Sequence, residues 1–208
     1  MVKAVIFDRD GVLLDSNKVI CRAYRLAAEE LGYDKMPRDE DVRSLLGIPY
    51  QIIVEKILGR GERILEVYSN VWKTRELEKE IKPMHGLEKM LEEIKLPKAI
   101  VTSGSSRLTS ICLKDSLKYF EVMVAESDVT KHKPDPEPLL LACEKLGVEP
   151  GETVYVGDTV TDYETARNAG AKFIGFLGDG SMRRDFEAAG AEMFIESLEE
   201  LPDAVKNL

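Results

Sequence analysis

The stretch from Lys3 to Ser16, which reads K-A-V-I-F-D-R-D-G-V-L-L-D-S, constrains the fold of this chain more than any other. It begins with the apolar run Ala4 to Phe7, whose unbroken hydrophobicity predicts a strand buried on both faces. Two carboxylates, Asp8 and Asp10, follow this run, and Gly11 then permits a sharp turn that a side chain would obstruct. The sequence therefore predicts a buried strand that ends in acidic side chains.

Two carboxylates spaced this closely at the end of a buried strand repel each other. A neighbouring cation would offset the repulsion, and Mg²⁺ is the natural candidate because hard divalent ions prefer oxygen ligands. Taken alone, the stretch also fits a solvated turn with two surface aspartates. The choice between these interpretations depends on the rest of the chain.

The composition excludes several classes of partner. The chain has 208 residues, with 29 Lys and Arg against 38 Asp and Glu, and a formal net charge of −9. This acidic balance argues against nucleic acid or an anionic membrane surface as a partner, because both attract basic proteins. No apolar run approaches the roughly 20 residues of a membrane span, and the first strand begins without a preceding secretory signal.

These features predict a cytoplasmic protein that is a monomer or a homodimer and that binds neither nucleic acid nor membrane. The cysteines are odd in number, lie far apart in the sequence and sit in apolar helical patterns. We therefore expect them to be buried free thiols: Cys21, Cys112 and Cys143.

Residues 16–81 carry helical patterns and no strand signal. Apolar side chains recur at three- and four-residue steps after Ser16, a candidate N-cap, and Gly32 is a candidate helix end. Further helices are predicted at residues 39–46, 49–58 and 62–81. Turn residues near 14–16 and 82–86 bound this block. We therefore expect an all-helical cap domain at 16–81, inserted into a core domain formed by residues 1–15 and 82–208.

From residue 82 onward, predicted helices and strands alternate. The helices are expected at residues 87–94, 106–117, 136–146, 162–168, 182–188 and 198–205, and the strands at 98–101, 122–125, 153–156, 171–176 and 193–195. Alternation of this kind predicts an α/β fold with a parallel sheet and helices on both faces. In such sheets, ligands bind beyond the carboxyl ends of the strands.

Polar side chains follow each of the first four predicted core strands. They are Asp8 and Asp10, Thr102 and Ser103, Lys133, and Asp158 and Asp162. Each has an ordinary alternative when taken singly: a helix cap for Thr102 or the later aspartates, and a solvated loop for Lys133. Because parallel strands end at one edge of the sheet, their combined position favours a single site.

The acidic members suit a magnesium ion. Oxygens of Asp8, Asp10 and Asp158 can serve as its ligands and leave room for water and a phosphate oxygen. Asp162 lies one helical turn beyond Asp158, on the same face, where it can orient the ligands.

The remaining members suit a phosphate group. The hydroxyl of Thr102, together with the backbone amides of the turn that starts at Ser103, can cradle phosphate oxygens at a helix start. Lys133 supplies a positive charge that offsets both the phosphate and the carboxylates.

Four motifs occur in this order: D-x-D-G-V at residues 8–12, the Thr102 element, K-P-D-P from Lys133, and G-D-x-x-x-D at 157–162. Together they resemble the motifs of the haloacid dehalogenase-like hydrolases, and most of all the phosphoglycolate phosphatase-like branch. The resemblance spans essentially the whole chain. It implies a Rossmann-like parallel sheet core with an inserted helical cap, and a phosphatase that acts on a small phosphorylated metabolite.

The resemblance also implies roles for the aspartates. Asp8 would be the nucleophile that forms an aspartyl-phosphate, and Asp10 would protonate the leaving oxygen and then activate water. Asp8, the backbone carbonyl of Asp10 and Asp158 would hold Mg²⁺, while Asp162 would support them. Dehalogenases of this family lack an equivalent of Asp10, so its presence favours phosphoryl transfer.

Some positions depart from the family pattern. Arg9 stands where an apolar residue is usual; we expect a surface ion pair, with contact to an anionic substrate as the alternative.

Ile48 follows Gly47 where β-phosphoglucomutases carry an arginine, which weakens a mutase assignment. A phosphomutase and a non-catalytic binding protein on the same scaffold stay open as alternatives. Three apolar residues are expected to pack in the core of the cap and not to contact a ligand: Val67, Val71 and Trp72.

Overall fold

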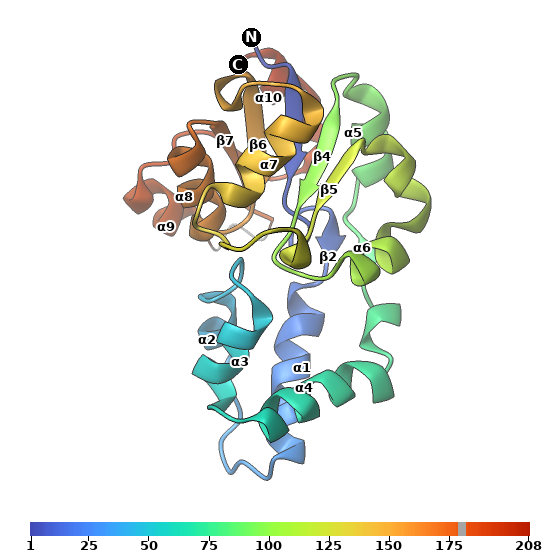
Figure 1. The fold of residues 1–208 in the computed structure, drawn as a ribbon, viewed down its shortest axis with the longest axis vertical. Coiled ribbons are helices and arrows are strands. Elements are labelled where there is room, and N and C mark those ends of the chain that lie inside the picture. Colours follow the sequence, from blue (N-terminus) through green and yellow to red (C-terminus); the bar gives the residue numbers. More distant parts are fainter. Residues whose placement is uncertain (179–181) are drawn as a thin grey trace.

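The computed structural model describes residues 1–178 and 182–208. Six parallel strands of the described chain form one sheet in the order β5-β4-β1-β6-β7-β8. They are β1 (Ala4–Phe7), β4 (Lys98–Val101), β5 (Val122–Val124), β6 (Thr153–Gly157), β7 (Lys172–Phe176) and β8 (Phe194–Ile195). Helices flank this sheet (Figure 1). The predicted α/β fold with a parallel sheet is confirmed.

Strand β1 lies inside the sheet because all its side chains are apolar, and every one is 0% exposed. Val5 and Phe7 belong to the hydrophobic core on one face, and Ile6 belongs to the core on the other. Phe7 pairs with Ile100 of β4 and with Val156 of β6. The residues that follow these three strands therefore leave the sheet side by side.

Helices connect the strands and cover the sheet. They are α5 (Leu87–Glu93), α6 (Ser106–Leu113), α7 (Glu137–Leu146), α8 (Val160–Ala169), α9 (Arg183–Ala189) and α10 (Leu201–Lys206). Short 3₁₀ turns supplement them: η2 (Lys114–Tyr119), η3 (Glu126–Asp128), η4 (Pro150–Glu152) and η5 (Leu198–Glu200). Helix α7 packs on β4 and β5, and α8 packs on β6 and β7.

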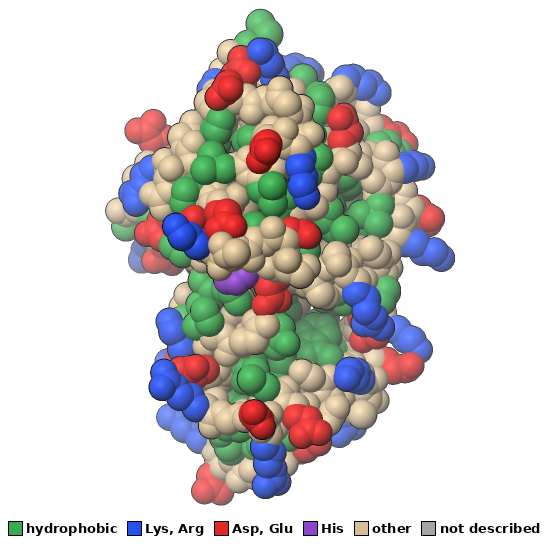
Figure 2. Space-filling model, in the orientation of Figure 1, with side chains coloured by type: hydrophobic (Ala, Val, Ile, Leu, Met, Phe, Trp, Pro, Cys, Tyr) green, Lys and Arg blue, Asp and Glu red, His purple; other side chains and the backbone are tan. Residues whose placement is uncertain are grey.

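A second group of helices lies beyond the carboxyl ends of the strands, in the lower half of Figure 1. It comprises α1 (Asn17–Glu30), α2 (Asp39–Arg43), α3 (Tyr50–Leu58), α4 (Glu62–Thr74) and η1 (Leu77–Lys79). Helix α1 contacts α2, α3 and α4. We call this group the helical lobe; Figure 2 shows a waist between it and the rest of the molecule, with hydrophobic side chains set back from the surface.

A two-stranded antiparallel ribbon stands where the chain enters and leaves the lobe. Strand β2 (Leu14–Asp15) pairs with β3 (Lys82–Pro83), with Leu14 opposite Pro83. The sequence does not predict this ribbon because two-residue strands carry no periodic signal. The division into a core domain and a cap domain at these turns stays a prediction.

Several predicted helices are shorter in the structure. The helix predicted at 62–81 ends at Thr74, because Glu76 adopts a left-handed backbone with φ of 50°. The helix predicted at 106–117 ends at Leu113 and continues as a 3₁₀ turn. The one predicted at 39–46 ends at Arg43. Hydrophobic periodicity continues past these ends, so it did not reveal them.

Two expectations from composition can be compared with the described residues. None of the helices there combines the length and the apolar character that a membrane-crossing segment requires. The cysteines are free thiols, as predicted, although burial is complete at only two of them: Cys21 and Cys143 are buried, and Cys112 is half-buried.

Candidate active site

Three carboxylates meet beyond the ends of β1 and β6. One oxygen from each of Asp8, Asp158 and Asp162 lies within 4.8 Å of the others. Gly11 allows Asp158 to lie directly against the loop that follows β1. Its φ is +74°, and a Cβ at this position would stand 1.9 Å from Oδ2 of Asp158. The structure thus brings together Asp8 and Asp158, which are 150 positions apart in the sequence.

Lys133 lies inside this acidic cluster. Its Nζ donates hydrogen bonds to Oδ1 of Asp8 and Oδ1 of Asp162, both at 2.7 Å, and to Oη of Tyr155 at 3.0 Å. Its side chain is 1% exposed. Burial by itself would lower the pKa of Lys133, but the charges of Asp162 and Asp8 raise it well above its usual value. The alternative of a solvated loop lysine is therefore wrong.

Tyr155 was not among the predicted site residues. It belongs to β6, and its hydroxyl donates to Oδ1 of Asp162 at 3.0 Å. In the sequence it is one apolar position in the run T-V-Y-V, which predicts only a core residue. Its hydroxyl becomes a site group only because the neighbouring strand ends place charges against it.

Asp162 serves both as a helix cap and as a partner of the site residues. Its Oδ2 accepts hydrogen bonds from the backbone amide of Thr159 at 3.1 Å and from Oγ1 of Thr159 at 2.6 Å, as a capping box at the start of α8 requires. Its Oδ1 accepts from Lys133 and Tyr155. Because both oxygens already have donors, Asp162 is suited to hold Lys133 in place and less suited to bind a metal directly.

Asp158 and Asp8 have the properties of cation ligands. Oδ2 of Asp158 accepts a hydrogen bond from Nδ2 of Asn17 at 3.0 Å, but its buried Oδ1 has no hydrogen-bond partner among the described residues. Burial, followed by the charges of Asp8 and Asp162, raises the pKa of Asp158 well above its usual value.

For Asp8, burial is again the main cause, and it raises the pKa to about 7 although the Lys133 ammonium lowers it. One ammonium group, that of Lys133, does not balance the three clustered carboxyls, so the cluster needs more positive charge. A hard divalent cation with oxygen ligands would supply it, so these residues fit Mg²⁺.

The predicted phosphate loop follows β4. Oγ1 of Thr102 accepts a hydrogen bond from the amide of Gly104 at 3.1 Å, and the N-cap of α6 is Ser105, so Thr102 is not a helix cap. Oγ of Ser103 donates to the backbone carbonyl of Gly47 at 2.6 Å. The Ser103 hydroxyl therefore joins the sheet edge to a loop of the helical lobe, a contact that the sequence did not predict.

Asp10 lies outside the three-carboxylate cluster. Its Oδ2 accepts from Nε of Arg9 at 3.0 Å, and its Oδ1 accepts from Oγ of Ser16 at 2.7 Å. Arg9 is only 3% exposed, so the expectation of a surface ion pair is wrong. Arg9 is buried because its side chain, just beyond the end of β1, points towards the start of α6, where protein acceptors surround it.

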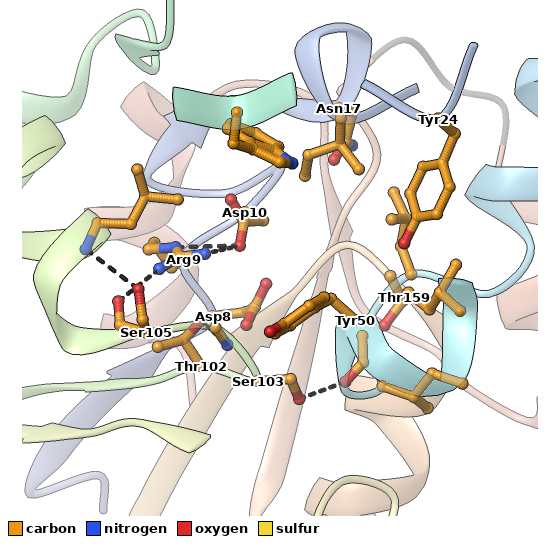
Figure 3. Close-up of a pocket in the computed structure, with 18 of the residues that line it drawn as sticks. Asp8, Arg9, Asp10, Asn17, Tyr24, Tyr50, Thr102, Ser103, Ser105 and Thr159 are labelled. Atoms are coloured by element: carbon orange, nitrogen blue, oxygen red, sulfur yellow. Dashed lines mark hydrogen bonds and ion pairs between the residues drawn. The ribbon is translucent and has the colours of Figure 1, made fainter. Parts of the chain in front are cut away.

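A cavity of about 310 Å³ lies between the sheet edge and the helical lobe. Figure 3 shows Asp8, Asp10 and Thr102 on one side of it and Tyr24 and Tyr50 on another. Its lobe side carries four aromatic residues, which we call the aromatic wall: Tyr24, Tyr50, Tyr68 and Trp72.

The rings of the aromatic wall contact one another. The Tyr24 and Tyr68 centroids are 4.6 Å apart, and Tyr50 stacks on Tyr68 at 5.9 Å. Val71 is buried at 1% exposure, as predicted, whereas Trp72 lines the cavity and does not belong wholly to the lobe core. Neighbouring positions on α4 thus differ, because Val71 packs in the hydrophobic core and Trp72 lines the cavity.

Comparison with known proteins supports these motifs. The family model of the haloacid dehalogenase-like hydrolases matches residues 5–176. A phosphorylated carbohydrates phosphatase of Thermotoga maritima is 35% identical over 185 residues, which cover 83% of this chain and 84% of that protein. A phosphoglycolate phosphatase of Aquifex aeolicus is 31% identical over 179 residues, with coverage of 82% and 83%.

A solved structure shows the same fold over the full length. It is a Thermotoga maritima protein provisionally assigned as a β-phosphoglucomutase, with a TM-score of 0.73 and 30% identity, and the match covers 100% of each chain. The family match includes every predicted motif from Asp8 to Asp162. This chain therefore belongs to the haloacid dehalogenase-like hydrolases and is a phosphatase of the phosphoric monoester hydrolase class.

Proposed function

We propose that this protein is a Mg²⁺-dependent phosphatase that hydrolyses small phosphomonoesters in the cytoplasm through an aspartyl-phosphate on Asp8. One observation carries the proposal most directly. Asp8 is held by Lys133 in a buried cluster beside Asp158, whose Oδ1 lacks a donor among the described residues. That arrangement prepares a carboxylate to meet a phosphoryl group and leaves a place for a cation.

The two aspartates of the first motif divide the chemistry. A carboxylate oxygen of Asp8 attacks phosphorus, the bond from phosphorus to the leaving oxygen breaks, and Asp10 gives that oxygen a proton. Asp10, now a carboxylate, takes a proton from water as the water oxygen attacks the phosphorus of the aspartyl-phosphate. The bond from phosphorus to the Asp8 oxygen then breaks, which releases inorganic phosphate and restores the Asp8 carboxylate. Bound by Asp8, Asp158 and the backbone carbonyl of Asp10, Mg²⁺ would offset the negative charge of the phosphoryl group.

Other residues hold the phosphoryl group. We assign this role to Thr102 and Ser103 at the end of β4 and to the Lys133 ammonium, all of which line the cavity. Asp162 keeps Lys133 in place through the 2.7 Å hydrogen bond. Ser103 reaches the phosphoryl group only after its hydroxyl leaves the Gly47 carbonyl, so this contact couples phosphate binding to the helical lobe.

The aromatic wall favours a leaving group with a ring. Aromatic faces pack well against flat or ring-shaped apolar surfaces, and a two-carbon acid would leave most of the wall without contact. The name of the Thermotoga maritima relative, a phosphorylated carbohydrates phosphatase, supports this choice. We therefore place sugar phosphates ahead of phosphoglycolate as substrates.

A phosphomutase on the same site is the second candidate, because one of the solved structures that match the whole chain is provisionally assigned as a β-phosphoglucomutase. Ile48 follows Gly47 where the arginine of such mutases would stand, so the cavity lacks that cation at this position. Release of inorganic phosphate from a sugar phosphate supports the phosphatase; isomerisation without release supports the mutase.

The test is a phosphate-release screen over sugar phosphates and small phosphorylated acids, with and without Mg²⁺. The Asp8→Asn variant keeps the shape of the side chain but not the nucleophile, and we expect no turnover. Asp34→Asn, at an exposed position of the helical lobe, is the matched control and should retain full activity. Equal phosphate release by Asp8→Asn and the wild-type protein would refute the assignment.

A further inference from the structure

Arg9 stands between Asp8 and Asp10 in the sequence, and its side chain has partners on several sides. Nε and Nη2 both donate to Oδ2 of Asp10, at 3.0 and 2.5 Å. Nη1 donates to the backbone carbonyl of Ser105 and to Oγ1 of Thr109, both at 3.1 Å. Figure 3 shows the guanidinium between Asp10 and Ser105. The loop after β1 is thereby tied to the start of α6.

The neighbouring chain is built around this guanidinium. A Cβ at Gly104 would stand 2.2 Å from Nη2 of Arg9. Gly104 is not among the glycines with positive φ, so its backbone does not require glycine. The missing side chain instead makes room for the Arg9 guanidinium. An arginine exposed at the surface would not require a glycine beside it.

These contacts leave Arg9 little capacity to bind a substrate. An arginine has five N–H donors, and Asp10, Ser105 and Thr109 already take Nε, Nη2 and both hydrogens of Nη1. Its side chain is 4% exposed, whereas that of Asp10 is 22% exposed. Both side chains line the cavity, but Asp10 is the more exposed of the two.

We propose that Arg9 is a positioning residue that fixes the carboxyl group of Asp10 for proton transfer to the leaving oxygen. Arg9 holds Oδ2 and Ser16 holds Oδ1, so the carboxylate of Asp10 cannot turn freely about its side-chain bonds. The inference rests on the proposed function, in which Asp10 gives that proton. It differs from the expectation that Arg9 contacts an anionic substrate.

The test compares two probes that need the proton to different degrees. p-Nitrophenyl phosphate releases a stable phenolate and needs little protonation, whereas an alkyl phosphate such as glycerol 2-phosphate releases a basic alkoxide. The value of kcat/KM reports transfer to Asp8, before the later hydrolysis step. In Arg9→Met we expect kcat/KM to fall about 100-fold for the alkyl phosphate, the lower range of general acid catalysis, and less than about fivefold for the aryl phosphate.

Asp10→Asn should show the same selective loss of kcat/KM. In the double variant, kcat/KM for the alkyl phosphate should be no lower than in either single variant, because the two residues act as one unit. Arg38→Met, which removes an exposed arginine paired with Asp41, is the matched control and should leave both values unchanged. If Arg9→Met does not fold, Thr109→Val removes one acceptor of the guanidinium at nearly constant side-chain volume. This variant should show the same selectivity, with a smaller loss of kcat/KM.

Equal losses on both substrates in Arg9→Met and Thr109→Val would overturn the inference, since a structural or phosphate-binding role affects every substrate alike. A selective loss that is absent from Asp10→Asn would overturn it as well. The proposed function fails separately: it is refuted if Asp8→Asn keeps its activity, whatever the Arg9 variants do.

Discussion

At the scale of single residues, the site reuses groups that also hold the fold together. Asp162 accepts the N-terminal hydrogen bonds of α8 with one oxygen and the Lys133 and Tyr155 donors with the other. Lys133 in turn neutralises carboxylates whose burial would otherwise be costly. The same buried cluster that prepares the nucleophile is therefore a stabilising element only as long as each partner is present.

Gly11 and Gly32 allow a residue-scale prediction about how closely the backbone must approach Asp158. Their φ angles are nearly the same, +74° and +75°, but only Gly11 has atoms within 4 Å of the place where a Cβ would stand. Gly32→Ala should lower the free energy of unfolding by about 1 kcal/mol, the cost of left-handed backbone, and should leave activity intact.

Gly11→Ala should carry the same backbone strain and also push Asp158 out of place, because the new Cβ would lie 1.9 Å from Oδ2. We expect kcat/KM to fall at least about 100-fold through misplacement of a site group. Urea unfolding measures the first effect, and phosphate release measures the second. Wild-type kcat/KM in Gly11→Ala would show that this approach does not matter for the reaction.

At the scale of elements, a strand ribbon and side-chain hydrogen bonds join the helical lobe to the sheet edge. The ribbon β2–β3 joins the entering and leaving chain. Beyond it, Ser103 bonds to the Gly47 carbonyl, and Nε2 of Gln51 donates to Oε1 of Glu126, both at 2.6 Å. These contacts place the aromatic wall opposite the carboxylates, so the lobe decides what kind of leaving group fits.

Trp72 provides the element-scale prediction, because it is the largest member of the aromatic wall. If the wall packs against a ring, Trp72→Ala should lower kcat/KM for sugar phosphates about tenfold, as expected for the loss of about 1 kcal/mol of aromatic packing and some buried area. It should leave phosphoglycolate nearly unaffected. Ile111→Ala, at an exposed position of α6, is the control. A uniform loss over both substrate classes would contradict the role of the wall in selectivity.

At the scale of the whole molecule, the parallel sheet brings distant segments to one place. Strands β4, β1 and β6 are neighbours, so the loops that follow them supply Thr102, Asp8 and Asp158 to one edge. The connection after β5 adds Lys133. A metal bound at this edge would therefore contact segments from both halves of the sheet and should stabilise the whole fold.

We accordingly predict that Mg²⁺ raises the midpoint of thermal unfolding. At 100 times its dissociation constant, a ligand that binds only the folded state adds about 2.7 kcal/mol to the free energy of unfolding. For a chain of this size, that is a shift of roughly 5–10 °C in the midpoint.

Removal of the metal with EDTA should abolish phosphate release, and added Mg²⁺ should restore it. Asp158→Asn should lose both the thermal shift and the activity, whereas Asp34→Asn should keep both.

Much of this organisation could be read from the sequence, because it depends on local patterns. The apolar run before Asp8, the alternation after residue 82 and the helical periodicity of residues 16–81 predicted the sheet and the helical block. Short features without periodicity were missed: the β2–β3 ribbon, the end of α4 at Thr74, and the 3₁₀ turn after α6. Tyr155 was missed because its hydroxyl has no significance until Lys133 and Asp162 face it.

The sequence by itself determined which side chains stand at the ends of which strands, because strand ends and turns follow from local hydrophobicity and from glycine. Only the tertiary structure decided how those side chains are paired. It buried Arg9 against Asp10, turned Ser103 to the Gly47 carbonyl and set Trp72 on the cavity. The physical reason is that burial and hydrogen-bond geometry depend on neighbours that are distant in the chain, and a local pattern carries no record of them.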